Sequence, residues 1–181
     1  MNALRKILNT ALNVLAGLSL TVMVVLTTYQ VVTRYVLNNP STWSEELVGY
    51  LFAWSTMFGA ALVSGERGHM NIPIVIDQFS PAVRKAFHIF SEVIAFLFSA
   101  TILVFGGVQV SNLAMGQQTS SLGVAVGVFY WVMPICGVIM ALYTLLNIIG
   151  IMKGDISLDA SDEASEAIAK VEAESAAEKE A

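Results

Sequence analysis

Residues 93–152 read VIAFLFSATILVFGGVQVSNLAMGQQTSSLGVAVGVFYWVMPICGVIMALYTLLNIIGIM and contain no Asp, Glu, Lys or Arg. One membrane crossing requires about 20 predominantly apolar residues. The stretch is therefore long enough for two crossings, separated by the uncharged polar turn at 115–123. This pattern is typical of a membrane protein and excludes an ordinary soluble domain, in which about a quarter of the residues are charged.

Two further charge-free runs precede it, at 7–33 and 47–65. The sequence therefore predicts an all-α integral membrane protein with four transmembrane helices, at about 8–33, 47–65, 93–112 and 124–150. The first run follows two basic residues, as a signal peptide does, but it is much longer than the 7–15 apolar residues of a signal sequence. We expect it to be retained as a helix.

The distribution of basic residues predicts the orientation. With the N-terminus in the cytoplasm, the inner side receives six basic residues: Arg5, Lys6, Arg67, Arg84, Lys85 and Lys153. The outer side then receives only Arg34. Because Lys and Arg in short loops favour the cytoplasm, both termini are expected there.

The net charge of −5 comes from the end of the chain. Residues 155–181 contain nine acidic and two basic residues, whereas residues 1–154 contain seven basic and five acidic ones. We therefore divide the chain into a four-helix membrane unit, 1–154, and an acidic cytoplasmic tail, 155–181, that is predicted to be disordered. The membrane unit has no basic surface interleaved with aromatic residues, so nucleic acid binding has no support.

The loop between the second and third spans is long and partly apolar. Ser80 and Pro81 form a helix start, and apolar residues then recur at helical spacing with Arg84 and Lys85 between them. This pattern predicts an amphipathic helix that lies in the cytoplasmic membrane interface before span three. The alternative is that span three begins early and is simply long.

Chemistry-bearing residues are scarce. None of the predicted span cores contains an ionisable residue, which argues against a path for a charged solute through this chain alone. His69 and His88 are the only histidines, and Cys136 is the only cysteine. These residues give no haem or zinc site, and we expect no cofactor, no metal and no enzymatic activity.

Three groups of residues are functional candidates. The first group consists of pairs of small residues that permit close helix packing: Ser55/Gly59, Ala60/Ser64, Ala61/Gly65 and Gly123/Gly127. The second consists of charged and aromatic residues at the outer surface: Arg34, Trp43, Glu45 and Glu46. The third lies after span two: Glu66, Arg67 and His69.

Each group also has a purely structural interpretation. The small residues are expected to pack helices within the four-helix unit rather than against a partner. Thr42 and Glu45 form a capping box, and Arg34 is expected to pair with Glu45 or Glu46. Glu66, Arg67 and His69 can be ordinary residues of a cytoplasmic loop.

Taken together, the order of these motifs resembles a known family. The chain reads Gln30-Val31-Val32-Thr33-Arg34-Tyr35, then Trp43-Ser44-Glu45-Glu46-Leu47, then Gly59-Ala60-Ala61, then Glu66-Arg67-Gly68-His69-Met70-Asn71-Ile72. This succession resembles the DctQ-type small permease subunit of the tripartite ATP-independent periplasmic (TRAP) transporters. The resemblance covers about residues 5–152 and includes the segments 116–119 and 130–134.

The resemblance implies a partnership. In that family a periplasmic substrate-binding protein delivers an organic acid to two membrane subunits, and the large, DctM-type permease subunit holds the substrate and sodium sites and moves as an elevator. The small subunit then scaffolds its partner. The substrate could be a C4-dicarboxylate, a sialic acid or another sugar acid.

The resemblance also assigns roles to the candidate residues. Arg34, Trp43, Glu45 and Glu46 correspond to an outer cluster with local structural roles or contacts to the binding protein. Glu66, Arg67 and His69 correspond to an inner cluster that contacts phospholipids or the large subunit, and we expect Arg84 and Lys85 to make contacts of the same kind on the cytoplasmic side. Thr119-Ser120-Ser121-Leu122 departs from the family, in which a proline often follows the threonine, and the acidic tail has no counterpart.

A second functional hypothesis needs no partner. A four-span protein can act as an independent channel or small-solute carrier, although the uncharged spans argue against this. A membrane-embedded enzyme is the third alternative, and the sequence shows no catalytic group for it.

Overall fold

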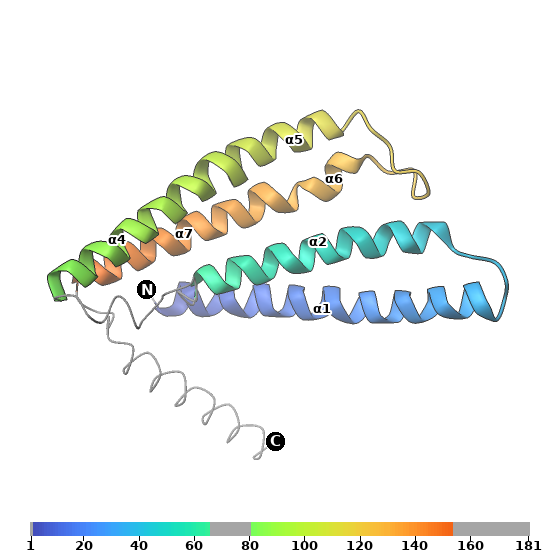
Figure 1. Cartoon of the computed structure of the whole chain (residues 1–181), viewed down its shortest axis with the longest axis horizontal. Coiled ribbons are helices and arrows are strands. Elements are labelled where there is room, and N and C mark those ends of the chain that lie inside the picture. Colours follow the sequence, from blue (N-terminus) through green and yellow to red (C-terminus); the bar gives the residue numbers. More distant parts are fainter. Residues whose placement is uncertain (1, 66–80, 154–181) are drawn as a thin grey trace, which may run out of the picture.

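The computed structural model describes residues 2–65 and 81–153, in which the regular secondary structure is helical. In chain order the elements are α1 (Asn2–Tyr35), α2 (Thr42–Gly65), α4 (Pro81–Phe98), the π-helix η1 (Ser99–Gly106), α5 (Gly107–Ala114), α6 (Val126–Tyr130) and α7 (Val132–Lys153). In Figure 1, α4 leads through η1 into α5 as one continuous rod, and α6 leads into α7. The described helices therefore form four rods.

All four rods are long and apolar enough to cross a membrane, which confirms the predicted four-helix membrane fold. They run over Leu4–Tyr35, Thr42–Gly65, Val83–Ala114 and Val126–Lys153. Each rod is longer than the span predicted from its charge-free run. The difference arises because the helices continue through polar flanking residues, such as Arg34 and Lys153, that were not counted as membrane-spanning.

The third rod distinguishes between the two alternatives given above for the segment that begins at Pro81: a separate interfacial helix, or an early start of span three. Residues 81–98 form α4, which runs on into η1 without a separate interfacial helix in the described residues. The apolar side chains of Phe87, Phe90 and Ile94 lie exposed along α4 and continue the exposed apolar side of the rod. Span three thus begins early and is long, while residues 66–80 lie outside the described part.

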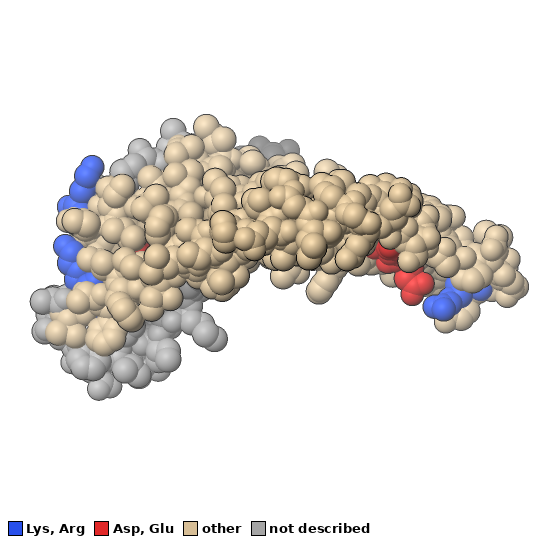
Figure 2. Space-filling model, turned by 90° about the horizontal axis from the view of Figure 1, so that it is seen from above, with Lys and Arg blue, Asp and Glu red and all other residues tan. Residues whose placement is uncertain are grey.

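The rods lie side by side in one thin, curved layer, as Figures 1 and 2 show from perpendicular directions. α2 packs between α1 and α7, and α7 packs between α2 and the α4–η1–α5 rod. Within the chain, 11% of the most apolar window of α1 is buried, against 44% for the α6–α7 rod. The layer therefore leaves most of its apolar surface uncovered by its own helices.

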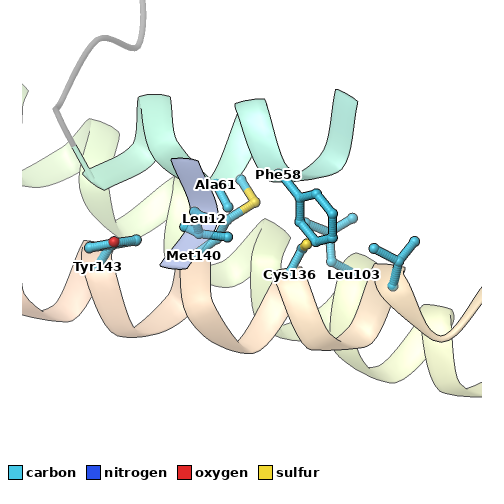
Figure 3. Packing of buried hydrophobic residues seen from close by; sticks show 8 residues of the cluster. Leu12, Phe58, Ala61, Leu103, Cys136, Met140 and Tyr143 are labelled. Atoms are coloured by element: carbon cyan, nitrogen blue, oxygen red, sulfur yellow. The ribbon is translucent and has the colours of Figure 1, made fainter. Parts of the chain in front are cut away.

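The buried core lies where α7 meets its neighbours. Its members are Leu12, Phe58, Ala61, Leu103, Val132, Cys136, Met140 and Tyr143. Figure 3 shows Phe58 of α2 next to Cys136 of α7, and Ala61 close to Leu12 and Met140. α7 supplies half of these side chains, which explains why it is the most buried of the four spans.

Two glycines of the small-residue pairs predicted from the sequence permit close approaches between helices. A Cβ atom at Gly127 would lie 2.3 Å from the carbonyl oxygen of Ser111, so α6 packs directly on the backbone of α5. A Cβ atom at Gly65 would lie 2.9 Å from the ring of Tyr143, where α2 meets α7. Close approach of this kind requires a residue without a side chain.

The other small residues play different roles. Gly123 lies in the loop before α6 with a φ of 67°, a left-handed conformation that glycine adopts without strain. Its expected role in helix packing is therefore replaced by a role in the turn. No atom lies within 4 Å of the Cβ position of Gly59, and Ser55 is half-buried, so this pair is not a tight helix contact among the described residues.

Candidate functional site

Glu46 joins the start of α2 to the loop between α5 and α6. Its carboxylate accepts hydrogen bonds from the backbone N–H groups of Ser120, at 3.1 Å, and Ser121, at 2.9 Å. Hydrogen bonds to an ionised carboxylate are stronger than those between neutral groups. Glu46 therefore fixes a loop that lies 74 residues further along the chain.

The same loop is closed internally by a short ladder. The N–H of Thr119 donates to the carbonyl of Val124, and the N–H of Val126 donates to that of Gln117, both at 2.9 Å. The Thr119 hydroxyl also accepts from the N–H of Val124, at 3.0 Å. This ladder, and not a proline, defines the conformation of the loop that departs from the family pattern.

Two aromatic residues of α2 extend the contact begun by Glu46. The rings of Tyr50 and Phe129 stack, with centroids 4.0 Å apart and planes 7° from parallel. The indole N–H of Trp54 donates to the carbonyl oxygen of Phe129, at 2.8 Å. Glu46, Tyr50 and Trp54 follow one another at intervals of four residues, so they share one face of α2.

Glu46, Tyr50 and Trp54 therefore form one contact surface of α2. Sequence reasoning placed Glu46 in an outer cluster and did not join Tyr50 or Trp54 to it. The four-residue spacing was a usable signal, since a carboxylate and two aromatic rings on one helix face indicate a common contact. The partner of that contact was not visible, because it comes from the loop and α6.

The remaining outer residues are not joined to Glu46. Arg34 and Glu45 are exposed, and in the described part of the chain no ion pair connects Arg34 with Glu45 or Glu46. The expected pairing is therefore not formed, and the Glu46 carboxylate is instead engaged by Ser120 and Ser121.

Trp43, 41% exposed, instead packs its ring 5.9 Å from that of Tyr29. At this end of the molecule Figure 2 shows acidic residues beside Lys and Arg, whereas the middle of the face is almost entirely tan. Exposed opposite charges and an aromatic ring thus gather at one end of the layer.

At the opposite end, Asn147 of α7 connects all four rods. Its side-chain oxygen accepts from the guanidinium of Arg5, at 2.6 Å. Its amide nitrogen donates to the carboxylate of Glu92, at 3.0 Å, and to the carbonyl of Ser64, at 3.3 Å. Arg5, Ser64 and Glu92 belong to α1, α2 and α4, so one amide bridges three other helices.

We call the residues Arg5, Ser64, Glu92 and Asn147 the polar junction. Asn147 is completely buried, and its amide lies between a positive and a negative group. Such a position satisfies both the donor and the acceptor capacity of the amide, which is required of a buried polar group. One turn before Asn147, the Tyr143 hydroxyl donates to Asn9 and adds a second link between α7 and α1.

Sequence reasoning missed this junction. It counted Arg5 only toward orientation and did not single out Glu92, which directly precedes the charge-free stretch. The available signal was the amide at position 147 inside an apolar run, because an amide within a membrane helix requires a partner. Its partners come from three other helices and could not be identified from spacing.

The predicted cytoplasmic group is described only in part. Arg84 and Lys85 are half-buried on α4, at the end that also carries Arg5, Lys6 and Lys153, and Figure 2 shows Lys and Arg gathered there. Glu66, Arg67 and His69 lie outside the described residues, as does the tail at 155–181. His88 is 8% exposed on α4, one turn before Glu92.

The arrangement is therefore one of structural contacts at both ends of a thin helical layer. Residues 23–154 match the family described as the DctQ component of the tripartite ATP-independent periplasmic transporters. The chain belongs to the DctQ family. As a DctQ protein it is the small permease subunit of a TRAP transporter, a component of a transport system.

Curated relatives agree with this assignment. The DctQ chain is 29% identical over 153 residues to the sialic acid TRAP transporter small permease protein SiaQ of Vibrio cholerae, covering 84% of this chain and 88% of the relative. It is 28% identical over 125 residues to a putative TRAP transporter small permease protein of Haemophilus influenzae, covering 69% and 75%. A second such protein of Haemophilus influenzae is 23% identical over 160 residues, covering 86% and 99%.

Proposed function

We propose that this DctQ protein scaffolds the large, elevator-type permease of a sodium-driven TRAP transporter. The observation that carries the proposal is the architecture of the layer. Polar contacts fix its helices to one another at both ends, while most of its apolar surface is not covered by the other described helices. A scaffold requires both properties, since it must resist deformation and offer surface to its partner.

The proposed cargo is an organic acid: a C4-dicarboxylate, a sialic acid or another sugar acid. The relative in Vibrio cholerae is named for sialic acid, which favours this class without selecting one member. A periplasmic binding protein would deliver the acid. Arg34, Trp43 and Glu45 are exposed together and supply opposite charges and an aromatic ring, the chemistry of a polar protein contact.

The proposed location is the bacterial inner membrane, with the Arg5 end in the cytoplasm and the Arg34 end in the periplasm. The excess of Lys and Arg at one end supports this orientation. Arg84 and Lys85 would then lie at the level of anionic phospholipid headgroups, together with Glu66, Arg67 and His69. The acidic tail, 155–181, would extend from the membrane unit into the cytoplasm.

The decisive experiment has two steps. The chain is first purified from its native membrane in mild detergent, and bound proteins are identified by mass spectrometry. A large permease in stoichiometric amount is the expected result. Uptake is then measured in proteoliposomes with the large subunit alone, with this chain alone and with both, in the presence of the binding protein and a sodium gradient.

The proposal expects uptake only when both subunits are present. Full uptake by the large subunit alone would contradict a scaffolding role. Solute flux through this chain alone would support an independent channel or carrier instead.

A further inference from the structure

Helix α1 presents three distinct faces, two of which are exposed in the described part of the chain. One face is buried against the layer, with Leu12, Ser19 and Thr33 at most 7% exposed. A second face is exposed and purely apolar, and it includes Ile7, Val14, Leu18, Val22, Val25 and Val32. This composition is that of a surface in contact with lipid tails.

The third face is exposed but has a different composition. It consists of Thr10, Asn13, Gly17, Thr21, Val24 and Thr28, and we call it the Asn13 face. At 3.6 residues per turn, its centre lies about 170° around the helix from Leu12, Ser19 and Thr33, on the side opposite the buried face. Four of its six side chains carry a polar group, in contrast to the apolar face at the same depth.

Asn13 is the critical member of this face. Its side chain is exposed, and no hydrogen bond joins it to any described residue. It lies seven residues beyond Lys6, or about 10 Å further along the helix axis. Because the hydrocarbon region offers no water to hydrogen-bond, an amide there requires a protein partner.

The neighbours of Asn13 favour a helix as that partner. No atom lies within 4 Å of the Cβ position of Gly17, one turn away, so another backbone can approach closely at this point. The hydroxyls of Thr21 and Thr28 donate to the carbonyls of Gly17 and Val24, both at 2.8 Å. These threonines are therefore satisfied and act as small residues, which leaves Asn13 as the group to be paired.

We propose that the Asn13 face receives a transmembrane helix of the large permease. The partner helix carries a small residue opposite Gly17 and a hydrogen-bonding group opposite Asn13. This inference rests on the proposed scaffolding function. The fold also favours it sterically, since α1 forms an edge of the layer and packs along α2. A helix added at that edge displaces none of the contacts between the described helices.

Photo-crosslinking in the assembled complex tests the face directly. A benzoylphenylalanine residue is introduced at Gly17, on the Asn13 face, or at Leu18, on the apolar face. Both variants are co-expressed with the large subunit, and the membranes are illuminated. The proposal expects a crosslink to the large subunit from position 17 and none from position 18.

Two substitutions give an independent measure of the same contact. Asn13→Ala is expected to reduce the large subunit recovered with this chain by about threefold, the effect of one hydrogen bond between membrane helices. Gly17→Leu is expected to reduce it further. Ala11→Leu, which adds the same side chain on the apolar face, serves as the control and should leave recovery unchanged.

The outcomes separate this inference from the function on which it rests. A crosslink to the large subunit from position 18 alone would overturn the Asn13 face while supporting the partnership. A crosslink from position 17 to a second copy of this chain would assign the face to a homodimer and overturn the inference. Failure of unmodified chain to recover any large subunit would instead overturn the proposed function.

Discussion

The carboxylate of Glu46 lies 2.9 Å from the backbone nitrogen of Ser121, although 75 residues separate them in the sequence. This contact attaches one end of the α5–α6 hairpin to α2. At the other end of the layer, hydrogen bonds from the Asn147 side chain attach α7 to α1, α2 and α4. The two contacts explain how a layer of helices with a small core keeps a defined shape.

Glu46→Ala is expected to release the loop between α5 and α6, because the N–H groups of Ser120 and Ser121 lose their acceptor. Amide hydrogen exchange over residues 117–125 should become faster. Glu45→Ala is the matched control, since Glu45 is adjacent but exposed and makes no contact with this loop among the described residues. Equal exchange in the two variants would show that Glu46 does not hold the loop.

Asn147→Leu should lower the free energy of unfolding by about 1–3 kcal/mol, because it removes a buried group that bridges a guanidinium and a carboxylate. Unfolding in detergent, followed by circular dichroism, measures the change. Asn112→Leu provides the comparison, since Asn112 is exposed on α5. An equal free energy of unfolding for the two variants would show that the polar junction does not stabilise the protein.

Gly127→Ala is expected to separate α6 from α5, because the added methyl group would lie 2.3 Å from the carbonyl oxygen of Ser111. Overpacking of this kind costs about 1–3 kcal/mol. Gly49→Ala makes the same change on α2 where no atom lies within 4 Å, and it should be neutral or slightly stabilising. Thermal unfolding of both variants decides the matter, and a stable Gly127→Ala protein would contradict the close contact.

Arg34→Glu should leave the free energy of unfolding nearly unchanged, because Arg34 is exposed and unpaired within the described residues. If the outer cluster contacts the binding protein, uptake should require a higher concentration of that protein. This effect should diminish as salt is added, since salt screens exposed charges.

The combined variant Arg34→Glu with Glu45→Arg tests the ion pair expected from the sequence. Because that pair is absent from the structure, the second substitution should not restore uptake. Recovery of uptake in the double variant would show that the two residues do pair in the working transporter.

The sequence alone determined the membrane fold. Charges are excluded from hydrocarbon, so the charge-free runs had to mark the four spans, and only the ends of those spans were placed too far inward. The order of motifs from Gln30 to Ile72 was also sufficient to indicate the family that the comparison with known proteins then showed. Both inferences depend on residues that are close together in the sequence.

Only the tertiary structure decided how the polar residues are used. Glu46 could have paired with Arg34, and Glu92 could have faced water, because local spacing permits either arrangement. Their partners are 74 and 55 residues away, and helix packing alone brings such distant groups within hydrogen-bonding distance. The same packing leaves Asn13 exposed, since the buried face of α1 is set by its contact with α2 and not by the polarity of individual residues.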